Sequence, residues 1–293
     1  MATHNRPTYG GQAVIEGVMI RGQRHASVAV RRPDGTLAIK CEPLGQVYTG
    51  LLRKIPVLRG ILVLAEMMTL GMRALMYSAK VGAEAEGEEI GKGAIAATIA
   101  FSVTFAICIF FLLPVLASRS VEGLLGSEIL SNLVEGAIRM VLFIAYIYLI
   151  GRMREIRRVF MYHGAEHMTV HAQEREDSLD IASIRQYPTA HPRCGTAFLL
   201  TVMVVSIVVF TFVGRDPFWW LIVSRIVLIP VVAAVSYEVI RFSGFHSTSL
   251  LVRLITVPSL ALQSLTTREP DDEQIAVAIA AMDSALKADA QHL

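Results

Sequence analysis

Cysteine is scarce in this sequence, and so is any strong excess of charge. The 293 residues include three cysteines, Cys41, Cys108 and Cys194, whose scattered positions show no paired spacing. We therefore expect no disulfide framework. Charged residues make up 18% of the chain and leave a formal net charge of only +2. Because this balance lacks the basic excess that favours binding to nucleic acid, no nucleic-acid partner is expected.

No signal peptide is expected at the start of the sequence either. The first residues, MATHNRPTYGG, contain neither an apolar core nor a cleavage site, so we expect an N-terminus that stays in the cytoplasm. Apolar side chains, in contrast, are abundant: 54% of the residues are hydrophobic and the mean hydropathy is +0.52. Soluble domains of this size are more polar, so the composition predicts an integral membrane protein that contacts the lipid bilayer.

Four segments are long and apolar enough to cross about 30 Å of hydrocarbon. They cover residues 94–117, 132–151, 196–214 and 218–240. Four arginines follow the second segment directly. The short connections that join the first segment to the second, and the third to the fourth, carry little positive charge. By the positive-inside rule, both termini and the loop at 152–195 are expected to face the cytoplasm. The predicted fold class is therefore mainly α, a polytopic helical membrane protein with about four transmembrane helices.

The rest of the chain is expected to form smaller regions around the membrane domain at 94–240. Residues 1–50 contain alternating apolar residues and the turn sequence Pro33-Asp34-Gly35, which predict a cytoplasmic β-hairpin region. Residues 241–293 are predicted to form an interfacial helix and a terminal helix with an acidic first turn. Glu16, among the N-terminal glycines, is a candidate metal ligand or substrate contact, although such a residue more often only satisfies a loop.

Residues 51–93 are predicted to form an interfacial helix followed by an acidic linker. The helical part is apolar, but Arg59, Glu66 and Arg73 recur every seven residues in it. Each charge would cost about 2.5 to 3.5 kcal/mol near the centre of a bilayer. The pattern therefore favours a helix at the membrane surface, or one packed under the membrane domain, whose polar stripe lies in water.

Two predicted spans contain charged residues. Arg139 in the second span and Arg225 in the fourth lie at similar depth, and Glu135 lies one helical turn from Arg139. An ion pair between Glu135 and Arg225 would hold the two helices together. No chain of ionisable groups continues through the other spans, so a transport function ranks last among the hypotheses.

Histidine is concentrated in the loop between the second and third spans. His163 and His167, with Glu166 between them, form an HxxEH motif on a predicted helix. One helical turn separates the two histidines, so both can bind one zinc ion while the glutamate serves as a general base. His167 and His171 could form such a pair as well, but all three cannot share an ion because eight residues span about 12 Å of helix.

A metal held by two histidines needs further ligands, and the sequence HPRC offers two. His191 and Cys194 lie beside Pro192, which favours a turn that can fold both side chains toward the helix. The predicted metal ligands are therefore His163, His167, His191 and Cys194, with Zn²⁺ as the expected ion or another divalent transition metal in its place. Three ligands would leave a position for water, whereas four would make a closed structural site.

Four separate motifs resemble those of the bacterial YqhQ family of integral membrane proteins. These motifs are GGQAVIEGVMIRG, YHGAEHMTVHA, HPRCGTAFLL and LTTREPDDEQIAVAIAAM, spread from Tyr9 to Met282. The resemblance implies a multi-pass protein of the bacterial inner membrane, in a family often described as metal-dependent enzymes because of its histidine motif. Met168 departs from the lysine expected there, which argues against a cation acting beside Glu166.

The leading functional hypothesis is a zinc-dependent hydrolase acting at the cytoplasmic face. Glu166 would be the catalytic general base, and the substrate would be a membrane-associated peptide or lipid with an amide or ester bond. One alternative is a scaffold or assembly factor with a structural zinc site. Another is a cysteine hydrolase or acyltransferase in which His167 or His191 activates Cys194.

Overall fold

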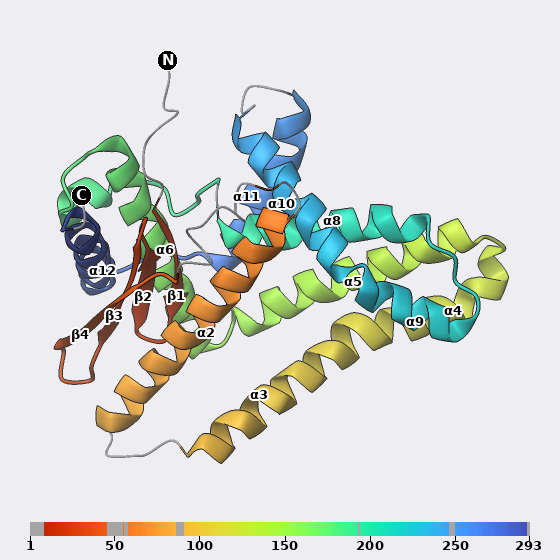
Figure 1. Cartoon of the computed structure of the whole chain (residues 1–293), viewed down its shortest axis with the longest axis horizontal. Coiled ribbons are helices and arrows are strands. Elements are labelled where there is room, and N and C mark those ends of the chain that lie inside the picture. The colour runs from red at the N-terminus through yellow and green to blue at the C-terminus, as the bar shows by residue number, and fades with distance from the viewer. Residues whose placement is uncertain are drawn as a thin grey trace.

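The computed structural model describes residues 9–45, 55, 58–85, 91–192, 194–245 and 250–291. The described chain is mainly helical and contains one small antiparallel sheet near the N-terminus. The sheet lies with α6 (Arg154–Arg175) and α12 (Asp272–Ala290) at one end of the molecule, and the apolar helices extend away from it (Figure 1). The fold class predicted from composition and periodicity is thus confirmed at this level.

The sheet is a meander of four strands in the order β1-β2-β3-β4. Its strands are β1 (Gly10–Val14), β2 (Gly17–Arg21), β3 (His25–Arg31) and β4 (Leu37–Pro43). Strands β3 and β4 form the predicted hairpin, in which the Thr36 amide donates to Asp34 Oδ1 (2.9 Å) and Gly35 takes a positive φ of 84°. The glycine-rich sequence before the hairpin supplies the two further strands.

Both faces of the sheet are covered, which explains why its central strands are buried throughout. Val18 and Ile20 of β2 belong to the core that the sheet forms with α6 and α12. The intervening Met19 belongs instead to a second core on the opposite face, which includes Ala74 and Val81 of α2 (Leu58–Ala85). Alternation along the strand therefore places successive side chains in two different cores.

The buried carboxylate of Asp289 connects the end of α12 to the β2–β3 turn through hydrogen bonds. Asp289 accepts hydrogen bonds from the amides of Gln23 (2.6 Å) and Arg24 (3.1 Å) and from the Tyr9 hydroxyl (3.1 Å), and it lies 2.9 Å from His25 Nδ1. Burial would raise the pKa of Asp289, but these partners hold it below its ordinary value. Burial and the neighbouring carboxylate raise the pKa of Tyr9 to about 12.

Replacing Asp289 with asparagine is expected to destabilise the protein and to flatten its pH dependence. Leaving buried donors without an anionic acceptor costs about 1 to 3 kcal/mol. Because the folded pKa is lowered, the stabilisation is present above the ordinary aspartate value of about 3.9 and is lost as the pH falls through the folded pKa. Thermal unfolding in detergent at neutral and acidic pH measures this. A variant with the wild-type pH profile would contradict the assignment.

Three described helices are long and apolar enough to cross a membrane, and a bent pair makes a fourth candidate. The three are Arg59–Glu84, Gly93–Leu125 and Glu128–Ile150, and the pair is Phe218–Val227 with Ile229–Phe242, bent by 43°. The first matches α2 and the second combines α3 (Lys92–Ile107), η2 (Cys108–Leu112) and α4 (Leu113–Leu125). The others are α5 (Glu128–Ile150), α9 (Phe218–Val227) and α10 (Ile229–Phe245), and the apolar α8 (Gly195–Thr211) is a shorter helix of 17 residues.

Helix α2 differs from the sequence-based expectation in where its charges point. Glu66 is 1% exposed and lies 2.9 Å from Arg21 of β2, and Arg59 forms an ion pair with Glu238 of α10. The prediction of a stripe in water is therefore wrong for these two residues, because each charge has a partner on a neighbouring element; only Arg73 is exposed. Apolar side chains are exposed on α2 instead, namely Met68, Met72, Leu75 and Met76.

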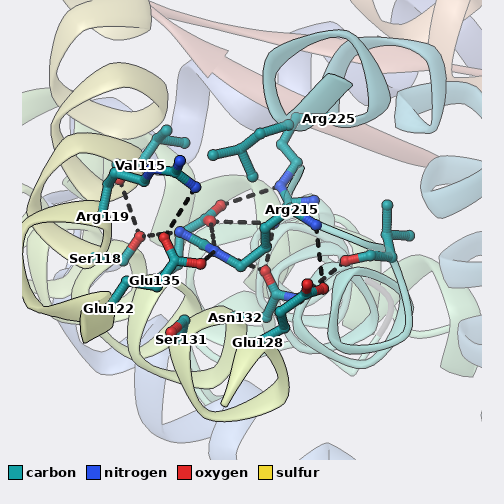
Figure 2. Close-up of polar contacts among 12 residues, drawn as sticks. Val115, Ser118, Arg119, Glu122, Glu128, Ser131, Asn132, Glu135, Arg215 and Arg225 are labelled. Carbon is teal, nitrogen blue, oxygen red and sulfur yellow. Dashed lines mark hydrogen bonds and ion pairs between the residues drawn. The ribbon is translucent and has the colours of Figure 1, made fainter. Parts of the chain in front are cut away.

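A network of buried charges joins the apolar helices (Figure 2). The expected ion pair is present, with Arg225 Nη2 at 3.1 Å from Glu135 Oε2. Arg215 lies between the predicted spans at 196–214 and 218–240, yet its side chain is fully buried and lies 2.9 Å from the same carboxylate. Asn132 Oδ1 accepts from both arginines at 2.7 Å. The network thus connects α5, α9 and the segment before α9.

Candidate metal site

One face of α6 carries five side chains with metal-binding or acid-base chemistry. His163, His167 and His171 are spaced one turn apart, and Glu166 and Glu174 lie on the same face. The helix ends at Glu176, whose φ of 60° is left-handed. This helix therefore supplies most of the site, and its neighbours must supply the rest.

Two elements distant in sequence pack against this face. The first is the end of α11 (Leu250–Thr266), where the Arg268 amide donates to the Phe160 carbonyl (2.9 Å). Gly164 permits this approach, because a Cβ at that position would lie 2.2 Å from the Arg268 oxygen. The second is the loop after the short helix α7 (Ile181–Ile184), which brings Thr189 and Ala190 alongside α6.

The fully buried Gln263 of α11 fixes this loop. Its Oε1 accepts from the His191 amide (2.8 Å) and its Nε2 donates to the His191 carbonyl (2.9 Å). The Cys194 amide also donates to that carbonyl, at 3.2 Å. Gln263 therefore sets the position of both predicted ligands in the loop, and nothing in its local sequence indicated this role.

His163, His167 and Cys194 form the first candidate ligand group. One ligand atom of each lies within 4.8 Å of the others, and His163 Nε2 is 3.2 Å from Cys194 Sγ. His163 Nδ1 donates to the Thr266 carbonyl (2.9 Å) and His167 Nδ1 to the Thr189 carbonyl (2.6 Å). Since a carbonyl only accepts, both protons sit on Nδ1 and both Nε2 lone pairs remain available. Such outer hydrogen bonds orient histidine ligands in metal sites.

Cys194 supplies the sulfur of this group from the start of α8. Cys194 is the N-cap of α8, and its Sγ accepts a hydrogen bond from the Thr196 amide at 3.3 Å. The N-terminus of a helix favours negative charge, and the thiolate is the form of cysteine that binds metal. Two imidazoles and one thiolate form a donor set that suits Zn²⁺.

Glu166 lies beside this group rather than in it. Its Oε2 is 3.5 Å from His167 Nε2, and the carboxyl also accepts a hydrogen bond from the Gly11 amide of β1. Burial raises the pKa of Glu166 above its ordinary value, while the nearby His163 and His191 act in the opposite direction. Burial likewise lowers the pKa of His167 and favours the neutral imidazole that binds metal.

The remaining predicted ligand, His191, belongs to a second group with His171 and Glu174. The ring centroids of His171 and His191 are 4.4 Å apart, whereas those of His167 and His191 are 5.7 Å apart. Among the described residues, the structure therefore brings three of the four predicted ligands together and places the fourth next to them. Glu174 was missed, although its spacing of three residues from His171 places both on one helical face.

The comparisons with known proteins agree with the motifs. A family model described as "Protein of unknown function (DUF1385)" matches residues 55–288. "Uncharacterized protein YqhQ" of Bacillus subtilis (strain 168) is 32% identical over 298 residues, which cover 97% of this chain and 94% of that protein. The chain belongs to the YqhQ (DUF1385) family. Both ligand groups and Gln263 lie within the residues that match the YqhQ family model, and no solved structure matches the chain.

Glu16, the other candidate from the N-terminal motif, has different partners. It occupies the β1–β2 turn with a positive φ of 52°, and its carboxylate pairs with Arg158 of α6. The Tyr162 hydroxyl donates to it at 3.2 Å. Within the described residues, Glu16 is in neither ligand group and links the sheet to α6.

Proposed function

We propose that this YqhQ-family protein is a zinc-dependent membrane hydrolase, with the ion held by His163, His167 and Cys194 and with Glu166 as general base. The observation that carries the proposal is the convergence of three ligand atoms within 4.8 Å beside a carboxylate that is not one of them. Three protein ligands leave a fourth position for water or substrate. Zinc bound there would lower the pKa of a water ligand to about 7.

The proposed substrate is a membrane-associated peptide or lipid with an amide or ester bond. Two features support this choice: the site lies where the sheet and α6 meet the apolar helices (Figure 1), and exposed apolar side chains cover those helices. We place this end at the cytoplasmic face of the bacterial inner membrane, with both termini inside. Exposed Arg152, Arg154 and Arg157 at the start of α6 support that orientation by the positive-inside rule.

Metal removal tests the proposal. The purified full-length protein is expected to contain zinc, to lose hydrolysis after treatment with a chelator, and to regain it when Zn²⁺ is added back. Activity is measured on p-nitrophenyl esters with short and long acyl chains and on a peptide library in detergent micelles. Cys194→Ser is expected to weaken zinc binding. Hydrolysis that persists without metal but is lost in Cys194→Ser would instead favour a cysteine nucleophile, for which His163 Nε2, 3.2 Å away, is placed as base.

One non-enzymatic function is favoured by a specific observation. Cys194 is the N-cap of α8, and His167 is buried in α6. One ion bound to both would therefore connect the start of α8 to α6. A scaffold or assembly factor would use zinc in this way. Zinc removal that lowers the unfolding temperature, in a protein with no hydrolysis across the substrate panel, would support this alternative over the hydrolase.

A further inference from the structure

We propose that His171, Glu174 and His191 form a second site for a divalent transition metal, directly beside the first. The proposal deepens the proposed function, because a second ion would belong to the same reaction centre. It rests on separate residues, however, and can be tested separately. In the described chain these three residues form a group in which one ligand atom of each lies within 4.8 Å of the others.

The ligand atoms of this second group can be assigned from their contacts. His171 Nε2 lies 2.9 Å from the Ala190 carbonyl and must donate its proton there, so its Nδ1 carries the available lone pair. His191 Nε2 lies 3.5 Å from Glu174 Oε1, close enough for both atoms to bind one ion. Two imidazoles and one carboxylate are the ligand set of many catalytic zinc and iron sites.

The surroundings hold these side chains in place. Gln263 fixes the backbone of His191 through two hydrogen bonds, and the His191 side chain is buried. The ring of His171 stacks on Tyr187, with centroids 5.9 Å apart and planes 13° apart. Ligands that are oriented in this way before metal binds lose less freedom on binding.

Two sites explain the arrangement better than one larger site. His163 and His171 are separated by about 12 Å along the helix, which one ion cannot bridge. The two groups also differ chemically, because the first contains a thiolate and the second a carboxylate. Soft thiolate ligands favour zinc, whereas a set of imidazole and carboxylate ligands also accepts harder ions such as Mn²⁺ or Fe²⁺.

Metal stoichiometry tests this proposal with the full-length protein in detergent. After removal of metal and equilibration with Zn²⁺, the wild-type protein is expected to bind about two ions per chain, and Glu174→Gln and Cys194→Ser about one each. Glu155→Gln is the matched control, since it makes the same change at an exposed position of α6 and should keep the wild-type ratio. If Glu174→Gln accumulates poorly, His171→Gln removes another ligand of the same site.

Substitution with Co²⁺ distinguishes the two sites. Of the two proposed sites, only the one with Cys194 can give a thiolate-to-cobalt charge-transfer band, so the band should remain in Glu174→Gln and disappear in Cys194→Ser. One ion per wild-type chain with this band would overturn the second site and leave the first. One ion without the band would overturn the first site and leave the second. No bound ion, or an unchanged ratio in Glu174→Gln and His171→Gln, would overturn the second site.

Discussion

Replacing Glu166 with glutamine is expected to lower the rate of hydrolysis by about 10²- to 10⁴-fold, the usual contribution of a general base. The amide has the same shape as the carboxylate but cannot accept the proton of an attacking water. Glu166 lies 3.5 Å from His167 Nε2 and is not a member of either ligand group, so the zinc content should not change. The kcat of the purified variant, measured together with its metal content, gives the result.

Glu155→Gln again provides the control, because it makes the same chemical change at an exposed position of the same helix. Equal activity and equal zinc content in wild type and Glu166→Gln would show that Glu166 is not the base. Loss of zinc and of folded protein in Glu166→Gln would assign this buried carboxyl a structural role. A lower kcat with zinc and fold retained is the result that the hydrolase requires.

The local part of the site could be predicted from the sequence. His163 and His167 are four residues apart, and helical geometry alone places both on one face with Glu166 beside them. The third ligand, which comes from the loop at 189–194, could not be chosen from helical geometry. Whether His191 or Cys194 meets the pair depends on how the loop folds against Gln263, which is 72 residues from His191. Spacing along the chain contains no information about such a contact.

The fold shows the same division between local and distant causes. Alternation and turn residues predicted a hairpin, and long apolar runs predicted spans, because these patterns act within a few residues. The positions of Glu66 and Arg215 depended on partners elsewhere. Each charged side chain is buried because a group of opposite charge meets it from another element, Arg21 for Glu66 and Glu135 for Arg215. A prediction from the segment alone therefore placed Glu66 in water and did not anticipate the burial of Arg215.

Replacing Glu135 with alanine is expected to have the largest effect on stability. Its carboxylate lies 2.9 Å from Arg139 and Arg215 and 3.1 Å from Arg225. Removing one partner of a buried ion pair costs about 3 to 5 kcal/mol, because the remaining charge is left uncompensated. Here three guanidinium groups lose their shared anion, and both Arg215 and Arg225 are almost fully buried. Thermal unfolding in detergent, or the yield of folded protein, measures the loss.

A double variant shows whether the destabilisation by Glu135→Ala comes from the uncompensated arginine charges or from the cavity that the smaller side chain leaves. If uncompensated charge dominates, Glu135→Leu combined with Arg225→Leu should unfold at a higher temperature than Glu135→Leu alone, because the double variant leaves one fewer of the three guanidinium groups without the shared carboxylate. If the cavity dominates, Glu135→Leu alone should recover as much stability as the double variant. Glu84→Ala controls for a glutamate removed from a surface ion pair and should change stability by less than about 1 kcal/mol. A Glu135→Ala protein as stable as Glu84→Ala would show that the network does not hold the apolar helices together.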